Sequence, residues 1–270
     1  MASLDKKPKV FVVGETKVNW EELREYLEYT NNMEFWEVAQ EAREAGLHDA
    51  EVLDSTYAKL CYRSLTLGQN RNVTKIRDIP ENLVSVLRSK HGSVLEHSSV
   101  NMITTDCSRI YTHEQVRHRP GMAYSQTSGR YVRLNEIDVV FDPILEPIRQ
   151  SAGDLLRIIE KYYAEWADTL GLNDPKMAFE MKKKVTSALR RFAPNGQTNE
   201  IGITMNLRAA RHQLQLRTAP SAEWEIRYIF NQIFLKLTNR FKHLFSDAVC
   251  TPDEDLNSGL FSINFEYGAH

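Results

Sequence analysis

The chain has 270 residues, of which 42% are hydrophobic and 26% charged, and its formal net charge is −2. These values are ordinary for a globular protein that can bury a sizeable core. A net charge so close to zero gives no global attraction to nucleic acid or to an anionic membrane, so anion recognition must come from local clusters of arginine. The three cysteines include no CxxC pair, which argues against a disulfide framework or a zinc site.

Only one short apolar stretch, residues 10–13, lies near the N-terminus. It is too short for the core of a signal peptide or for a membrane span. We therefore expect a soluble, cytoplasmic protein that binds neither membranes nor nucleic acid.

Hydrophobic periodicity predicts a mixed fold with more helix than strand. In chain order we expect a strand at residues 10–13, helices at 20–29, 34–45 and 54–62, a polar loop at 68–72, a helix at 78–90, a strand at 99–105, and helices at 145–170, 174–193, 207–217 and 222–244. Gly153 marks the expected break in the longest helix. No repeat, low-complexity tract or long linker divides the chain, so one mixed domain is expected.

Residues 117–131, RHRPGMAYSQTSGRY, form the most unusual stretch of the sequence. A packed core would need a buried partner for each of its arginines, serines and amides. Planar guanidinium groups with hydroxyl and amide donors suit phosphates and planar heterocycles, and glycines let backbone N–H groups approach an anion. The segment therefore indicates anion or nucleotide binding, and a solvated basic loop is the alternative.

A second polar cluster follows residue 206. On a helix that begins there, Arg208, His212 and Gln215 share one face at i, i+4 and i+7. Asn206 stands where a helix N-cap is expected, a structural role that needs no ligand. A binding face and a solvated helix face both remain open.

A third cluster, HGSVLEH at residues 91–97, contains two histidines and a glutamate. Its spacing differs from the helical HExxH motif, in which the metal ligands recur at i and i+4. We therefore expect no metal site.

Taken in this order, the three clusters resemble the flavin-dependent thymidylate synthase family. Residues 117–119 match the family's Arg-His-Arg signature, and residues 128–131 match the Ser-x-Arg-Tyr sequence that ends the motif. Residues 91–97 are similar to its upstream element and residues 206–227 to its C-terminal element. The resemblance extends from about residue 58 to residue 245.

The resemblance implies an α+β fold, with helices packed around a sheet. Residues 1–270 would form a single catalytic domain, in which about residues 1–57 are an N-terminal extension of undefined role. The family implies a homotetramer whose active sites are shared between subunits.

The resemblance also implies the reaction, C5-methylation of a uridine monophosphate. Methylene-tetrahydrofolate would supply the carbon, reduced FAD the hydride, and NADPH the electrons. The substrate would be dUMP, with UMP expected as well. A UMP-selective methylase, a flavin- or nucleotide-binding protein without catalysis, and a nucleic-acid-binding module are the alternatives, and the near-neutral charge argues against the last.

The resemblance assigns residues by their place in the motifs. Substrate binding falls on Arg109, Glu114, Gln126, Ser128, Gly129, Arg130, Arg190 and Arg217. Cofactor binding falls on His91, Ser93, Glu96, Arg117, His118, Arg119, Asn206, Arg208 and His212, with His91 near the folate and the flavin ring. Arg190 and Ser128 are the expected catalytic residues. Arg190 would stabilise charge that develops on the uracil ring, while Ser128, with no His–carboxylate pair beside it in sequence, would orient the nucleotide.

The sequence departs from the family pattern at one place. Eight residues, 120–127, separate the Arg-His-Arg signature from Ser128, where the family usually has seven. The extra residue must displace backbone between Arg119 and Tyr124. A harmless bulge is one interpretation. A changed sugar pocket that accepts UMP, as in relatives from polyoxin-type nucleoside antibiotic pathways, is the other.

The cysteines give no indication of a catalytic nucleophile. Classical folate-dependent thymidylate synthases attack the pyrimidine with a cysteine, and none of the three here has a sequence neighbourhood that would lower its pKa. Cys61 is expected to pack in the core of its helix, and Cys107 is expected to follow a strand.

Overall fold

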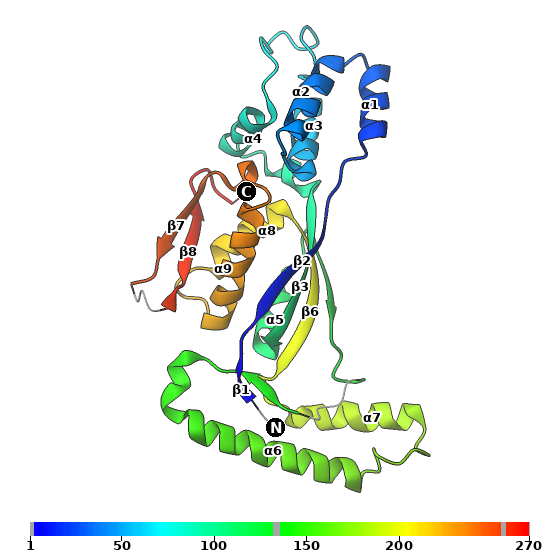
Figure 1. Cartoon of the computed structure of the whole chain (residues 1–270), viewed down its shortest axis with the longest axis vertical. Helices are drawn as coiled ribbons and strands as arrows, with labels where there is room; N and C mark the ends of the chain where they lie inside the picture. The colour runs from blue at the N-terminus through cyan, green and yellow to red at the C-terminus, as the bar shows by residue number, and fades with distance from the viewer. Residues whose placement is uncertain (1–2, 132–135, 255–257, 270) are drawn as a thin grey trace. The chain divides into compact units, whose positions relative to one another are not determined.

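The computed structural model describes residues 3–131, 136–254 and 258–269, and the chain divides into two compact units. Unit 1 consists of Met1–Phe11, Ile103–Arg119 and Tyr124–Ile203. Unit 2 consists of Val12–Met102, Pro120–Ala123 and Thr204–His270. Figure 1 colours the chain from the N-terminus to the C-terminus and labels most of its helices and strands. The single catalytic domain and the N-terminal extension stay predictions.

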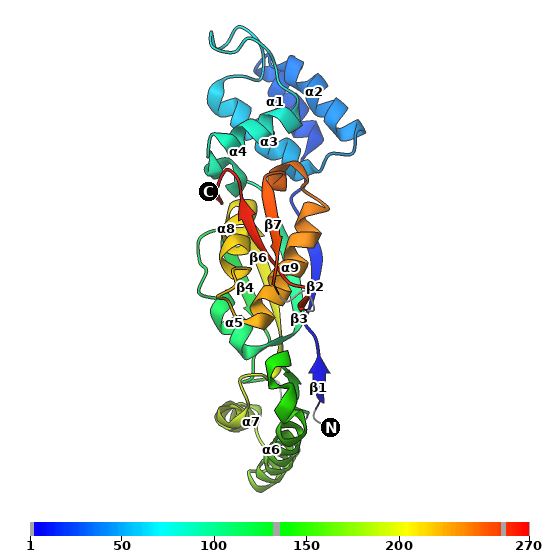
Figure 2. The same ribbon diagram turned by 90° about the vertical axis from the view of Figure 1, so that its left-hand side faces the viewer.

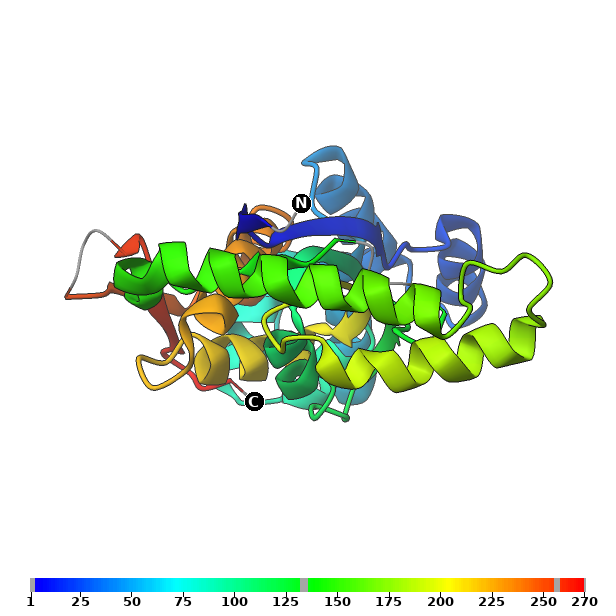
Figure 3. The same ribbon diagram turned by 90° about the horizontal axis from the view of Figure 1, so that it is seen from below.

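Unit 1 holds the two long helices of the middle of the chain. Its elements are β1 (Ser3–Lys6), α5 (Arg109–Gln115), β5 (Asp138–Val140), η2 (Pro143–Ile148), α6 (Arg149–Thr169), α7 (Phe179–Leu189) and η3 (Arg190–Phe192). β1 pairs with β5 in parallel, and α6 and α7 run side by side (Figure 3). Tyr163, Leu172 and Leu189 form the small core between these two helices.

Unit 2 holds most of the remaining helices. They are α1 (Trp20–Tyr29), α2 (Met33–Glu44), α3 (Asp49–Tyr62), α4 (Ile79–Arg88), η1 (Gly92–Glu96), α8 (Leu207–Arg217), α9 (Trp224–Thr238) and η4 (His243–Phe245). Helices α1 to α4 gather together (Figure 2), and β7 (Ala248–Pro252) pairs with β8 (Phe261–Phe265) in antiparallel fashion. No helix in the described ranges is long and apolar enough to cross a membrane. The expected cytoplasmic location stays a prediction.

A four-stranded sheet has the strand order β2-β3-β6-β4. Its strands are β2 (Lys9–Glu15), β3 (Ser99–Ser108), β6 (Thr198–Asn206) and β4 (Met122–Gln126). Each of these strands contributes residues to both units. In β6 the buried side chains of Ile201, Ile203 and Met205 alternate with partly exposed ones, as expected for a strand with one covered face.

Several expected elements are confirmed at nearly their predicted bounds. Helices α1, α2, α4 and α8 form where the periodicity placed them, and α3 begins five residues before the predicted Asp54. Capping explains two of the starts. The Asp78 carboxylate accepts the Glu81 N–H at 2.7 Å, and the Asn206 side chain accepts the Ala209 N–H at 2.8 Å. These caps fix where α4 and α8 begin.

Three helix boundaries were predicted wrongly. No helix opens at Asp174, because that carboxylate accepts the Lys176 N–H in a turn, and α7 begins only at Phe179. The long helix is unbroken at Gly153. Instead, it is preceded by the short 3₁₀ segment η2, which contains Pro147. The last predicted helix stops at Thr238.

The predicted packing of Cys61 is also wrong. Its side chain is exposed on α3, because that helix turns Thr56, Ala58 and Lys59 inward. Cys107 lies within β3, where it is buried, and does not follow the strand.

A buried ion pair fixes α8 in unit 2. Arg211 is 0% exposed, and its guanidinium donates to both carboxylate oxygens of Asp247, at 2.8 and 2.9 Å. It also donates to the backbone oxygens of Leu244 and Gly268 and lies 3.9 Å from the ring centroid of Phe265. A charged pair tolerates burial when both partners are hydrogen-bonded in this way. Helix α8 is thereby tied to the segments before β7 and after β8.

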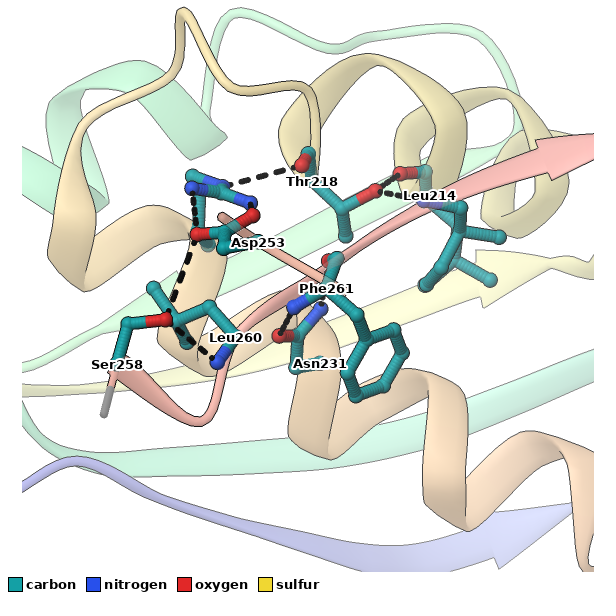
Figure 4. A network of polar contacts seen from close by, with 9 residues as sticks. Leu214, Thr218, Asn231, Asp253, Ser258, Leu260 and Phe261 are labelled. Carbon is teal, nitrogen blue, oxygen red and sulfur yellow. Dashed lines mark hydrogen bonds and ion pairs between the residues drawn. The ribbon is translucent and has the colours of Figure 1, made fainter. Parts of the chain in front are cut away.

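A second polar network ties α9 to the same C-terminal strands (Figure 4). Arg227 forms an ion pair with Asp253, with a contact of 2.7 Å, and donates to the Thr218 oxygen at 3.1 Å. The Asn231 amide donates to the Phe261 oxygen at 2.8 Å and accepts its N–H at 3.0 Å. The two C-terminal helices of unit 2 therefore share one anchor, the β7–β8 pair.

Asp54 is an unusual buried carboxyl on α3. It is 0% exposed, and the Ser98 hydroxyl donates to its Oδ2 at 2.7 Å. Burial raises the pKa of Asp54 from 3.8 to about 8, with Ser98 opposing the shift and Glu51 adding to it. At neutral pH this carboxyl therefore holds a proton in the folded chain.

The raised pKa of Asp54 predicts how stability depends on pH. The folded chain keeps a proton that the unfolded chain loses above pH 3.8, so the free energy of unfolding falls as pH rises toward 8, by up to about 1.4 kcal/mol per pH unit. Asp54→Asn stays neutral and can still accept from Ser98, so it should flatten this slope. Urea unfolding of both proteins at pH 5 and pH 8 measures the slopes. Equal slopes would show that Asp54 is ionised in the fold.

Candidate functional site

Unit 1 contains a cavity of about 560 Å³ that brings together five of the predicted substrate-binding residues. They are Arg109, Gln126, Ser128, Gly129 and Arg190. Arg191 and His113 also line it, and none of the described lining residues is acidic. A cavity with several cationic groups and no carboxylate suits an anionic ligand.

The short helix α5 places Arg109 at the cavity. The Ser108 hydroxyl accepts the Tyr111 N–H at 3.1 Å and so caps the helix directly before Arg109. The Arg109 N–H donates to the Asn195 oxygen at 3.0 Å, which joins α5 to the loop before β6. The start of α5 and this loop therefore form one wall.

Another part of the cavity lining comes from the end of β4 and the turn that follows. The Gln126 amide donates to the Thr112 hydroxyl of α5 at 2.8 Å. Ser128 begins a turn in which its Oγ accepts the Arg130 N–H at 3.3 Å and its carbonyl accepts the Tyr131 N–H at 3.1 Å. As an acceptor in this bond, the Ser128 hydroxyl keeps its own hydrogen available for a ligand.

Arg190 enters the cavity at the junction of α7 and η3. A Cβ added to Gly129 would lie 3.8 Å from Cδ of Arg190, so the two residues are close neighbours. Within the described chain, no histidine or carboxylate is hydrogen-bonded to the Ser128 Oγ. This arrangement favours Ser128 as an orienting group rather than as an activated nucleophile.

Three predicted substrate residues do not line this cavity. Glu114 is half-buried on α5, and Arg130 is exposed in the turn after Ser128. Arg217 ends α8 and belongs to unit 2.

The predicted cofactor residues divide between the two units. Arg117, His118 and Arg119 follow α5 in unit 1, where both arginines are exposed. The Tyr124 hydroxyl donates to the His118 oxygen at 2.7 Å, which closes the loop that holds the extra residue.

The remaining cofactor residues gather on η1 and α8, which contact each other in unit 2. Ser93 and Glu96 are exposed on η1, and Glu96 forms an ion pair with Arg208 on α8. His212 is exposed one turn further along α8. The structure therefore brings these four polar side chains onto two adjacent elements.

Gly121 is required where the chain passes α8. Its φ is +69°, its carbonyl accepts the Asn206 N–H at 3.0 Å, and an added Cβ would lie 2.4 Å from the Asn206 side chain. Only glycine combines this backbone conformation with so close a neighbour. The Pro120–Gly121 turn in the longer loop therefore sits against the cap of α8.

His91, the last of the predicted cofactor residues, precedes η1 and is exposed. The Tyr62 hydroxyl lies 2.6 Å from its Nδ1. His91 lines a second cavity, which belongs to unit 2.

Part of the first cavity wall lies outside the residues assigned from the motifs. This wall includes Asn195, Gln197, Thr198 and Asn199, four of the five residues in the polar run NGQTN that follows Pro194 and leads into β6. A polar run that begins four residues after Arg191 could have been identified from the sequence. Among the residues described, no group of three His, Cys, Asp or Glu side chains could hold a metal ion.

Comparison with known proteins identifies relatives that share one description. Residues 45–241 match the family model described as thymidylate synthase complementing protein. The flavin-dependent thymidylate synthase of Mycolicibacterium gilvum is 31% identical over 198 residues, which cover 72% of this chain and 77% of that protein. The corresponding enzyme of Mycolicibacterium vanbaalenii is 34% identical over 197 residues, which cover 70% and 76%.

Two solved structures are similar in fold. One is the UMP/dUMP methylase PolB from Streptomyces cacaoi bound with 5-Br dUMP, with a TM-score of 0.60, 16% identity, and coverage of 90% of this chain and 95% of that chain. The other is Thymidylate Synthase X from Helicobacter pylori with FAD and dUMP, with a TM-score of 0.55, 17% identity, and coverage of 89% and 98%. The expected mixed fold of helices and sheet is confirmed.

Gly121 provides a test of the local geometry. Gly121→Ala adds a methyl group at a positive φ and against Asn206, whereas Gly46→Ala adds one at φ +77° with nothing within 4 Å. The control should lose about 1–2 kcal/mol of unfolding free energy from backbone strain alone. Gly121→Ala should lose clearly more, as measured by urea unfolding. Equal losses would mean that Asn206 moves aside freely.

Proposed function

The chain belongs to the flavin-dependent thymidylate synthase family and is an enzyme, and from that premise we propose that it methylates C5 of a uridine monophosphate. The carbon would come from methylene-tetrahydrofolate and the electrons from NADPH. Bound reduced FAD would supply the hydride that completes the methyl group.

The observation that supports this proposal is the cation-lined cavity of unit 1. Its arginines offer charge-assisted donors to a phosphate and to pyrimidine carbonyls. Gln126, held by Thr112, offers an amide to the edge of the ring. Ser128 offers a hydroxyl whose hydrogen is free to bind the nucleotide.

Arg190 is the residue that we assign to charge stabilisation. C5 attacks a one-carbon unit readily when the uracil ring carries enolate-like negative charge, which is shared between C5 and a carbonyl oxygen. A guanidinium fixed beside that oxygen lowers the barrier, because it is already oriented when the charge develops. Ser128 orients the nucleotide, and the protein's contribution is mainly positioning.

The polar side chains on η1 and α8 fit FAD chemically. Arg208 and Ser93 suit pyrophosphate oxygens, while Glu96 and His212 suit ribose hydroxyls or the edge of a ring. The nearby Asn206 side chain already caps α8, so it contributes through the position of that helix.

We also propose that the substrate range includes UMP. The support is the eight-residue spacing between the Arg-His-Arg signature and Ser128, together with the Gly121 turn within it. A site that accommodates a 2′-hydroxyl without requiring it discriminates weakly, so both nucleotides should react.

A paired turnover assay tests the reaction and the substrate range. FAD-loaded protein with methylene-tetrahydrofolate and NADPH should methylate both dUMP and UMP, with products identified by mass. Methylation of dUMP alone would make the longer loop a harmless bulge, and methylation of UMP alone would make the protein a selective methylase. A yellow protein that methylates neither would be a flavin-binding protein without this catalysis.

Substitutions at the two proposed catalytic residues separate their roles. Arg190→Met should lower kcat at least about 100-fold, because the removed charge acts mainly in the transition state. Ser128→Ala should raise the KM for dUMP and keep measurable turnover. Complete loss of turnover in Ser128→Ala with unchanged dUMP affinity would contradict the orienting role.

We propose a homotetramer as the active assembly. Unit 1 exposes an apolar face on η2 and α6, where Leu155, Ile158 and Tyr162 follow i, i+3 and i+7 and are each about half exposed. Monomeric proteins rarely leave such a stripe uncovered, so a second copy is the expected occupant.

Disruption of this face tests the assembly. Light scattering should give a mass near four times 31.2 kDa for the parent chain and a smaller one for Ile158→Glu. Lys161→Gln, an exposed change on the same helix, is the matched control and should keep the parent mass. An unchanged mass in Ile158→Glu would place the subunit contacts elsewhere.

A further inference from the structure

The second cavity, in unit 2, has a volume of about 530 Å³ and is bounded by α3, residues 63–78 and α4. Lys59, Lys75 and Arg77 line it, among three serines, three asparagines and one threonine. None of its described lining residues is acidic, in a chain whose net charge is −2. The cavity is therefore a local concentration of positive charge that the overall composition does not predict.

Lys59 is the most unusual of these cations, because only 2% of its surface is exposed. Its ammonium donates to the Arg77 oxygen at 2.7 Å and lies 5.6 Å from the ring centroid of Phe35. No carboxylate of the described chain is within ion-pair distance of it. A buried charge without a counter-charge costs free energy that a bound anion would recover.

The charged neighbours of Lys59 do not remove this imbalance. Glu81, outside the cavity lining, pairs with Lys75 at 2.8 Å and lies 3.5 Å from the Arg77 guanidinium. It therefore partly neutralises Lys75 and Arg77 but does not pair with Lys59. Burial and, less strongly, the charge of Arg77 lower the pKa of Lys59 from 10.5 to about 8, although Asp78 and Glu81 oppose the shift. An anion in the cavity would favour the charged ammonium and raise the pKa again.

Two side chains connect the cavity to the proposed chemistry. Tyr62 and His91 both line it, and the Tyr62 hydroxyl lies 2.6 Å from the His91 Nδ1. The family resemblance assigns His91 to the neighbourhood of the folate and the flavin ring. A co-substrate that reaches His91 can therefore extend an anionic part over Lys59.

We propose that the Lys59 cavity binds an anionic group, carboxylate or phosphate, of a co-substrate. This inference rests on the proposed function, which supplies two candidates, the glutamate carboxylates of the folate and the phosphates of NADPH. The anionic group of either candidate would be held by the ammonium of Lys59 and by the exposed donors of Lys75 and Arg77.

Steady-state kinetics of two variants test the site. Lys59→Met fills the same space without the buried charge and should fold with unchanged or higher thermal stability. Lys59→Met and Lys75→Gln should each raise the KM of the anionic co-substrate by about 10-fold, the effect of one lost charge-assisted contact, and leave the KM for dUMP unchanged. Lys17→Gln is the control, since Lys17 matches Lys75 in exposure, at 66% against 64%, and also pairs with a glutamate.

Varying one co-substrate at a time distinguishes the two possible sources of the anionic group, the folate tail and NADPH. If the folate tail occupies the cavity, the variants should abolish any preference for triglutamyl over monoglutamyl methylene-tetrahydrofolate. If NADPH occupies it, they should instead abolish a preference for NADPH over NADH. Unchanged KM values for both co-substrates, with dUMP still methylated, would overturn the anion site and leave the proposed function standing.

A binding measurement keeps the test independent of turnover. Calorimetric titration of the FAD-loaded protein at pH 8 with triglutamyl tetrahydrofolate, and separately with NADPH, should show proton uptake for one of them, because the anion raises the pKa of Lys59. Lys59→Met should abolish that uptake. Uptake without any methylation would support the anion site and remove the proposed function. Identical proton counts in both proteins would remove the anion site.

Discussion

The organisation of unit 2 depends on the buried pair of Arg211 and Asp247. This deeply buried guanidinium is tolerated because its Nη1 and Nη2 groups meet fixed acceptors, so α8 can neither rotate nor slide without leaving a charge unpaired. The same helix carries Arg208 and His212 on its exposed side. The ion pair therefore sets which polar groups α8 presents to η1, and Glu96 meets Arg208 as a result.

The fold was predictable where periodicity and caps agree, as at Asp78 and Asn206. It was not predictable for β1, β4 and β5, since strands of three to five residues are too short to show an alternation. Arg211 shows that the sequence alone does not distinguish a buried structural arginine from one that binds a ligand. In sequence it lies between Arg208 and His212, two residues assigned to cofactor binding, and its partner Asp247 follows 36 positions later, so only the tertiary structure shows that Arg211 is internal.

The candidate substrate site also combines residues that the motifs identify with residues that only the tertiary structure can place. Motif positions identified five residues that line one cavity, because each is fixed locally by a cap, a turn or the end of an element. They could not show that Glu114 and Arg130 lie outside the lining, since that depends on the rotation of a short helix and the exit of a turn. Both cavities are cationic although the whole chain is nearly neutral, which means that ligand recognition here is a local property that the net charge conceals.

The interleaving of the two units has a consequence for biosynthesis. Unit 2 needs Thr204–His270 to become complete, and unit 1 needs the pairing of Ser3 with Asp138. Contacts between such distant positions form slowly. Unit 1 needs no residue beyond Ile203, whereas unit 2 cannot be completed while the ribosome still holds the C-terminal segment. Arg211 of α8 therefore stays buried without its counter-charge until Asp247 leaves the ribosome. A chain shortened after Phe245 would lose permanently the only buried charged partner that Arg211 has among the described residues.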